Sequence, residues 1–270
     1  MKRSGQNVRW ASTSFCQAVA ALYMAIASSA AAFCSFSMQT KGSVHVCTNT
    51  SCRKAGSRWT LDTFRAFAPG NVEVVETGCQ GRCGLGPNIL TKPSEELYNG
   101  VVQPATVAAI IEIEYGFPVA DALLGAFSHV SNGDTMYQRG LFAEALVSYT
   151  QCVDTAGAFE GTPKALSVAM MKKSNAMRMV AKEGRRGSLV AGSGTTAAAS
   201  GTFEEAEAAA RAAVELWPAN TAAWLNLADV LVDTGRVQEA LETLAKLKAD
   251  FPDAKFEASE KAARIRNTQQ

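Results

Sequence analysis

Histidine and nucleotide-binding motifs are scarce in this 270-residue sequence. The histidines are His45 and His129, and we treat both as structural, because a histidine-ligated cluster needs two such groups and four cysteines already suffice. The chain has no Gly-x-x-x-x-Gly-Lys-Ser/Thr loop, no Gly-x-Gly-x-x-Gly and no Gly-x-Ser-x-Gly. No catalytic carboxylate pair stands out either, so the sequence indicates no substrate.

An excess of charge is also missing. Lysine and arginine number 26 against 25 acidic residues, which gives a formal net charge of +1. A nearly neutral chain has no general attraction for nucleic acid, so we expect no nucleic-acid partner. With 47% hydrophobic residues, the composition is that of a globular protein large enough for one or two domains.

Cysteine, by contrast, is abundant, with seven residues. Cys47 and Cys52 are separated by four residues, and Cys79 and Cys83 by three, with 26 residues between the pairs. Each pair is flanked by glycine or small polar residues, which let a loop wrap a metal without bulky side chains in the way. The spacing therefore predicts a four-thiolate metal site.

The second pair lies in the run Gly-Cys-Gln-Gly-Arg-Cys-Gly at residues 78–84, followed by Pro87 and Asn88. This run and the two spacings resemble the thioredoxin-like [2Fe–2S] ferredoxin family, which includes the small cluster-bearing subunit of respiratory complex I and of related NAD-reducing hydrogenases. The resemblance covers about residues 42–116. It implies an α+β thioredoxin-like ferredoxin domain at 42–118 and one [2Fe–2S] cluster held by Cys47, Cys52, Cys79 and Cys83.

Two other interpretations of the cysteines stay open. Structural zinc usually has shorter spacing within each pair, and a disulfide framework suits small secreted domains. The three remaining cysteines, Cys16, Cys34 and Cys152, leave an uneven count that argues against secreted disulfide pairing. Cys152 lies in a helical segment, where we expect a buried, inert thiol.

The segment that carries the cysteine pairs alternates strand and helix patterns. Strands are expected at 43–46, 71–77 and 88–93, with a fourth strand or turn at 98–102, and a helix at 59–67. A further helix begins at Pro104 and ends near Gly116. Each cysteine pair then begins at the carboxyl end of a strand, where loops of sheet proteins carry chemistry.

Cations gather near these cysteines in sequence: Arg53, Lys54, Arg58 and Arg82. A reduced cluster carries one more negative charge, so adjacent cations favour reduction and offer a docking surface to an acidic redox partner. Each of them can equally be an ordinary solvated charge.

Residues 1–41 have the composition of a targeting presequence. Lys2, Arg3 and Arg9 precede an apolar stretch at 16–27, and small residues lead to Phe33. This arrangement is typical of a signal peptide, and the stretch is too short for a permanent membrane anchor, so no stable transmembrane span is expected in the mature chain. No acidic residue precedes Asp62, which also fits a transit segment.

The run Ala-Ala-Phe at 31–33 resembles the cleavage signal of the bipartite plastid presequences of diatoms and related algae. That resemblance implies a plastid location. A mitochondrial leader and the secretory pathway are the alternatives, and secretion fits poorly with an oxidation-sensitive cluster.

Residues 119–270 are rich in alanine and repeat themselves. The sequence motif that begins at Gly201 recurs 34 residues later at Gly235, and Pro218 recurs at the same distance as Pro252. An earlier copy begins at Gly140. The repeat resembles the tetratricopeptide repeat, which implies an all-α domain of stacked helix pairs.

The spacing between the first two copies is 27 residues over one period. We expect the excess to form a flexible loop at 183–200 between the helices of the middle repeat. We also expect 132–134, Asn-Gly-Asp, to interrupt the leading helix of the first repeat, and 254–266 to form a capping helix. A concave groove lined by Leu225 and Asp229 would then bind a protein partner.

The combined expectation is a plastid one-electron carrier whose repeats dock it onto a partner complex. One alternative is an assembly or scaffold factor, for instance for a photosynthetic complex, in which the cluster is structural or senses redox state. Another is a subunit of an NAD(P)H- or ferredoxin-linked oxidoreductase whose flavin lies on a different chain. All three favour a carrier or accessory subunit over a stand-alone enzyme.

Overall fold

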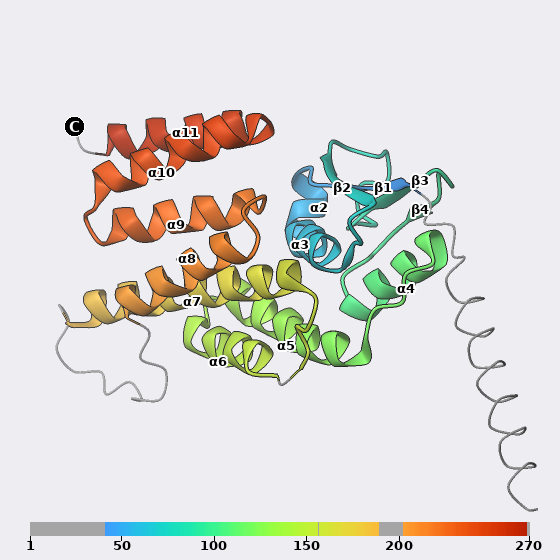
Figure 1. The fold of residues 1–270 in the computed structure, drawn as a ribbon, viewed down its shortest axis with the longest axis horizontal. Coiled ribbons are helices and arrows are strands. Elements are labelled where there is room, and N and C mark those ends of the chain that lie inside the picture. The colour runs from blue at the N-terminus through green and yellow to red at the C-terminus, as the bar shows by residue number, and fades with distance from the viewer. Residues whose placement is uncertain (1–40, 156, 189–201, 269–270) are drawn as a thin grey trace, which may run out of the picture. The chain divides into compact units, whose positions relative to one another are not determined.

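The computed structural model describes residues 41–155, 157–188 and 202–268 (Figure 1). The expected presequence, apart from Lys41, and most of the expected loop at 183–200 lie outside the described residues. Among the residues described, no helix is both long and apolar enough to cross a membrane.

A four-stranded mixed sheet forms the amino-terminal part. Its strands are β1 (Gly42–Cys47), β2 (Val72–Thr77), β3 (Ile89–Lys92) and β4 (Leu97–Tyr98), in the spatial order β2-β1-β3-β4. β1 is parallel to β2, and the pairs β1/β3 and β3/β4 are antiparallel. β1, β2 and β3 lie where the sequence pattern predicted strands, whereas β4 overlaps the expected fourth strand or turn at 98–102 only in Tyr98.

The amino-terminal part also contains three helices: α2 (Thr50–Lys54), α3 (Ser57–Phe67) and α4 (Pro104–Tyr115). α3 buries Leu61, Phe64 and Phe67, the residues that share one helical face in the sequence. α4 begins with its proline in the first turn and ends at Gly116, whose φ of 69° suits glycine at a helix end.

The carboxyl-terminal part contains helices joined by turns, and no strand occurs among its described residues. Its elements are α5 (Asp121–Gln138), α6 (Phe142–Val153), α7 (Pro163–Ser188), α8 (Phe203–Leu216), α9 (Thr221–Asp233), α10 (Val237–Asp250), the short 3-10 helix η1 (Pro252–Ala254) and α11 (Lys255–Asn267). The repeated motif lies at the start of α6, α8 and α10, so each copy begins the second helix of a helix pair. α11 packs on α10 through Ala258 and Ile265, as expected of a capping helix.

Two sequence expectations about these helices were wrong. The first concerns 132–134, because α5 continues through the Asn-Gly-Asp run without a break. Gly133 is needed there, since a Cβ on it would lie 2.6 Å from the ring of Tyr149 in α6. Asp134 is also used, because it accepts a hydrogen bond from the Tyr149 hydroxyl at 2.6 Å. Packing against α6 thus overrides the weak helix propensity of this run.

The second correction concerns the start of the expected loop at 183–200, because α7 runs on to Ser188. Asp233, at the end of α9, holds this part of the helix. Its carboxylate pairs with Arg178 at 3.0 Å and Lys182 at 2.8 Å, and its carbonyl accepts a hydrogen bond from Arg185 at 3.0 Å. These contacts offset the roughly 1 kcal/mol that Gly184 costs within a helix.

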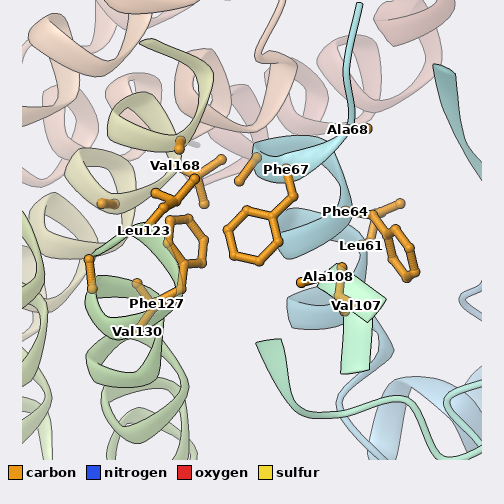
Figure 2. Close-up of a cluster of buried hydrophobic side chains, with 14 of the residues drawn as sticks. Leu61, Phe64, Phe67, Ala68, Val107, Ala108, Leu123, Phe127, Val130 and Val168 are labelled. Atoms are coloured by element: carbon orange, nitrogen blue, oxygen red, sulfur yellow. The ribbon is translucent and has the colours of Figure 1, made fainter. Parts of the chain in front are cut away.

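The hydrophobic core does not divide at residue 118. One continuous cluster of buried side chains joins the sheet and α3 to α5, α6 and part of α7. Figure 2 shows the contact, with Phe67 of α3 beside Phe127 of α5 and with Leu123 and Val168 close by. A second cluster unites α8, α9, α10 and α11. The sheet therefore shares its core with the first helix pair.

A buried ion cluster reinforces this junction. The Lys172 ammonium in α7 lies 3.0 Å from Asp134 of α5 and 3.2 Å from Asp62 of α3. Lys172 and Asp134 are each 6% exposed at the side chain. Burial lowers the pKa of Lys172, but the two carboxylates outweigh it, so the net shift is upward and the ammonium stays charged.

Candidate metal centre and docking groove

The sheet topology brings the two cysteine pairs to one edge. Cys47 is the last residue of β1, and Cys79 follows two residues after the end of β2. β1 and β2 are parallel and in register, with Cys47 opposite Thr77, so both chains leave the sheet at the same edge. Cys52 comes back to this edge in α2, and Cys83 lies in the loop after β2.

The second pair is drawn close together and is exposed. The sulfurs of Cys79 and Cys83 lie 3.2 Å apart and form no disulfide. Two thiolates on one tetrahedral metal with bonds of about 2.3 Å are about 3.8 Å apart, so a small adjustment would accommodate a metal between them. The backbone N–H of Gly81 lies 3.4 Å from the Cys79 sulfur and lowers the pKa of that thiol.

The first pair is buried. Cys47 is 0% and Cys52 2% exposed. Burial raises the pKa of Cys52 most, followed by a hydrogen bond with Cys47, and charge on Cys47 and Cys83 adds to the shift. The pKa of Cys83 is raised first by its hydrogen bond with Cys79, and charge on Cys47 contributes. The pKa shifts link Cys52 and Cys83 to Cys47, and Cys83 to its close neighbour Cys79, so the thiols form two pairs with electrostatic coupling between them.

Gly86 leaves room for the Cys52 sulfur. A Cβ built at Gly86 would lie 2.5 Å from that sulfur and 3.2 Å from the Cys52 Cα. A side chain at position 86 would displace this thiol, so the loop after β2 is shaped around Cys52. Four cysteine thiols are chemically the donor set of a thiolate-ligated group.

Hydrogen bonds tie the loop that carries Cys79 and Cys83 to the sheet. The Gln80 side chain donates to the carbonyl of His45 at 2.8 Å, and the Asn88 side chain donates to the carbonyl of Arg82 at 2.8 Å. His45 itself lies 2.8 Å from the Ser43 hydroxyl through its Nε2. These contacts fix the loop without using the histidine as a ligand.

The described part of the chain contains no group of three or more His, Cys, Asp or Glu side chains that could hold a metal ion. The arrangement of the thiols is pairwise, with a close contact within the second pair and electrostatic coupling between the pairs.

The surroundings of the cysteines are basic and partly apolar. Arg53, Lys54, Arg58 and Arg82 are exposed, and they form no ion pair within the residues that the structure describes. Leu85, between two glycines of the cysteine loop, is 55% exposed. A partner protein approaching this edge would meet cations around an apolar side chain.

The groove predicted from the repeats is present. Leu225 and Asp229 of α9 line a cavity of ≈ 890 Å³ together with α11 residues such as Phe256 and Ile265. Its other wall comes from α2, α3 and β2 and includes Arg53, Arg58, Leu61, Asp62, Arg65 and Glu76. The repeat pattern alone could not indicate this second wall, because the wall depends on how α3 packs against α7.

The sequence also missed Lys172, since a single lysine in a helical pattern is usually solvated. The expectation for Cys152 is confirmed in its burial: it is 0% exposed in α6, and burial raises its pKa to about 12.

Comparison with known proteins supports the helical part. Residues 197–265 match the family model described as tetratricopeptide repeat. This range covers α8 to most of α11, and tetratricopeptide repeats are modules of protein–protein interaction, so protein partners are indicated for this part. No curated protein matches the chain.

Proposed function

We propose that this protein is a plastid one-electron carrier of the thioredoxin-like [2Fe–2S] ferredoxin type, docked to a partner complex through its repeats. The observation that carries the proposal is the convergence of two cysteine pairs at one sheet edge, from parallel strands in register. A [2Fe–2S] cluster takes two thiolates on each iron, and the site offers two pairs.

The strand order supports a thioredoxin-like arrangement. A β-α-β unit is followed by an antiparallel hairpin and a helix, in the order β2-β1-β3-β4. Cys47 and Cys52 would hold one iron, and Cys79 and Cys83 the other. When bound, the cluster would supply one-electron chemistry, and the chain would do no bond chemistry of its own.

Groups of the protein itself would set the reduction potential of the cluster and its exposure to solvent. The Gly81 N–H, directed at the Cys79 sulfur, favours negative charge there, and such hydrogen bonds raise the potential of a cluster. The buried Cys47–Cys52 side keeps water away, while the exposed Cys79–Cys83 side faces the solvent. Electrons would leave through that exposed side, past Arg82 and Leu85.

A second function is an assembly or scaffold factor, and the groove favours it. The groove of ≈ 890 Å³ combines repeat residues with the α2–α3 wall beside the cysteines. As a scaffold factor, the protein would use the cluster to stabilise the α2–α3 wall or to change that wall with redox state. The protein bound in the groove would then be the one being assembled, and it would not be a redox partner.

The test of electron transfer uses a small acidic one-electron carrier, such as a plant-type ferredoxin, as the donor. The carrier, reduced with dithionite and freed of the excess, should transfer one electron to the oxidised protein, at a rate that falls as salt rises. Arg82→Glu should slow the transfer at low salt, and Arg139→Glu, an exposed change outside the cysteine loop, should not. Equal rates in the unaltered protein, Arg82→Glu and Arg139→Glu would contradict the proposed docking surface.

The two functions separate with Cys83→Ser. A carrier with this change should lose electron transfer while its repeats stay folded and bind as before. If the variant instead loses the helical fold or the partner complex along with the cluster, the scaffold account is correct.

A further inference from the structure

β2 lies at an open edge of the sheet. Its only strand neighbour among the described residues is β1. The carbonyls of Asn71 and Thr77 accept hydrogen bonds from the β1 side, from Gly42 at 3.5 Å and Thr48 at 3.0 Å. Every second residue of a strand directs its backbone N–H and C=O to the same side. The backbone groups of Glu73 and Val75 therefore also point toward β1.

The outward set is therefore Val72, Val74 and Glu76. The Val72 N–H donates to the carbonyl of Pro69 at 3.1 Å, so it is satisfied locally. The carbonyl of Val72 and both backbone groups of Val74 and Glu76 are left at the edge, and no strand of the described residues pairs with them. Such a row is a template for an added strand.

This edge opens into a groove and not onto a flat surface. A cavity of ≈ 610 Å³ is lined on one side by the five residues 72–76 of β2. On the other side stand the ends of two helix pairs, with Trp217 after α8 and Asp253 in η1. The Lys164 ammonium lies 5.7 Å from the centre of the Trp217 ring. An extended chain would fit between these walls with its backbone along β2.

The charges around the groove select the occupant. Four carboxylates line it, from Glu73, Glu76, Asp253 and Glu257, against two cations, Arg65 and Lys164. Glu73 and Glu76 are exposed, on opposite faces of the strand, while Val74 and Val75 are half-buried between them. A strand paired here would place cations beside the two glutamates, three residues apart, with β-branched residues between.

We propose that β2 binds an extended segment of another protein by strand addition, and that this segment carries lysine or arginine at a spacing of three around two β-branched residues. A second copy of the chain is disfavoured as occupant, because it would bring the same carboxylates against each other. The inference is independent of the cluster, since it uses no cysteine.

The probe is the synthetic peptide Ac-Thr-Lys-Val-Val-Lys-Thr-NH2, titrated into the full chain by calorimetry. We expect it to bind at least tenfold more tightly than the same peptide with glutamate in place of lysine. N-methylation of one alternate set of peptide amides should abolish binding, and methylation of the other set should leave it intact, because only one set faces β2. Equal effects of the two sets would overturn strand addition, and so would no binding at about 1 mM peptide.

Three protein variants complete the test. Val74→Pro removes an outward N–H at an edge position where proline is tolerated, so binding should fall at least tenfold while Val74→Thr retains it. If Val74→Pro lowers the melting temperature, the double change Glu73→Lys and Glu76→Lys serves instead, and it should reverse the preference between lysine and glutamate peptides. An unchanged preference would overturn the proposal.

Other occupants of the edge give distinct results. If the free full chain is a dimer that Val74→Pro converts to a monomer, a second copy occupies β2. If the amides of Val74 and Glu76 are already protected from hydrogen exchange in the monomer, the chain covers its own edge. Either result contradicts binding of a foreign segment.

Discussion

The ring of Phe67 in α3 meets the ring of Phe127 in α5 edge to face, with centroids 4.7 Å apart at an interplanar angle of 60°. Both side chains are buried, at 8% and 0% exposed, and they join the α3 side of the sheet to the first helix pair. The cysteine-bearing part and the start of the repeats therefore form one cooperative unit.

Phe127→Ala should destabilise both parts together, because it empties the centre of their shared core. We expect a loss of about 3–5 kcal/mol in the free energy of unfolding. Urea unfolding followed by helical circular dichroism and by tryptophan fluorescence should shift equally. Phe256→Ala, at a side chain that is 78% exposed, is the matched control and should change little. Two separate transitions in the variant would contradict the shared core.

Lys172→Met should be strongly destabilising, because it leaves the carboxylates of Asp62 and Asp134 without their buried cation. Removing one partner of such a cluster costs about 3–5 kcal/mol. Lys173→Met changes the next residue, which forms no ion pair within the part of the chain described, and should be nearly neutral. The comparison is made by chemical denaturation at one pH, and equal stability of the two variants would show that the cluster contributes nothing.

Tyr115 should make the fold sensitive to alkaline pH. Burial raises its pKa from 10.0 to about 12, and its hydroxyl donates to the carbonyl of Ser43 in β1 at 2.9 Å. The neutral phenol is favoured in the fold, so its contribution is complete below pH 10 and is lost as pH rises to about 12. The loss amounts to about 2–3 kcal/mol. Urea midpoints between pH 9 and 12 should fall less steeply in Tyr115→Phe than in the unaltered protein, and parallel curves would contradict this role.

Gly86→Ala should weaken the metal site without unfolding the sheet, because the added methyl group would lie 2.5 Å from the Cys52 sulfur. We expect iron retention to drop at least tenfold while the melting temperature of the metal-free protein changes little. Gly78→Ala is the control, since a Cβ there meets nothing within 4 Å. Full iron retention in Gly86→Ala would show that this loop does not shape the ligand position.

Much of the fold was predictable because local patterns carried it. The alternation around Val44 and Val46 predicted β1, and the spacing of Leu61, Phe64 and Phe67 predicted α3. The repeated motif predicted the starts of α6, α8 and α10. The approach of the cysteine pairs to one edge also followed from sequence, because both follow strands.

The long-range contacts were not predictable. Helix propensity alone breaks α5 at Gly133, yet the ring of Tyr149 sixteen residues later requires a glycine there. The extension of α7 depends on Asp233, which lies far along the chain from Arg178. The wall that α3 adds to the repeat groove depends on Lys172 and Phe127, whose partners no local pattern reveals.

The most direct test of the account is the iron and sulfide content of the anaerobically purified full chain, combined with its visible absorption and paramagnetic resonance before and after dithionite. The account predicts two irons and two sulfides per chain, a coloured oxidised protein and a one-electron paramagnetic signal on reduction, all lost in Cys83→Ser and kept in Cys152→Ser. A colourless protein with one zinc, or with no metal and a disulfide between Cys79 and Cys83, would contradict it.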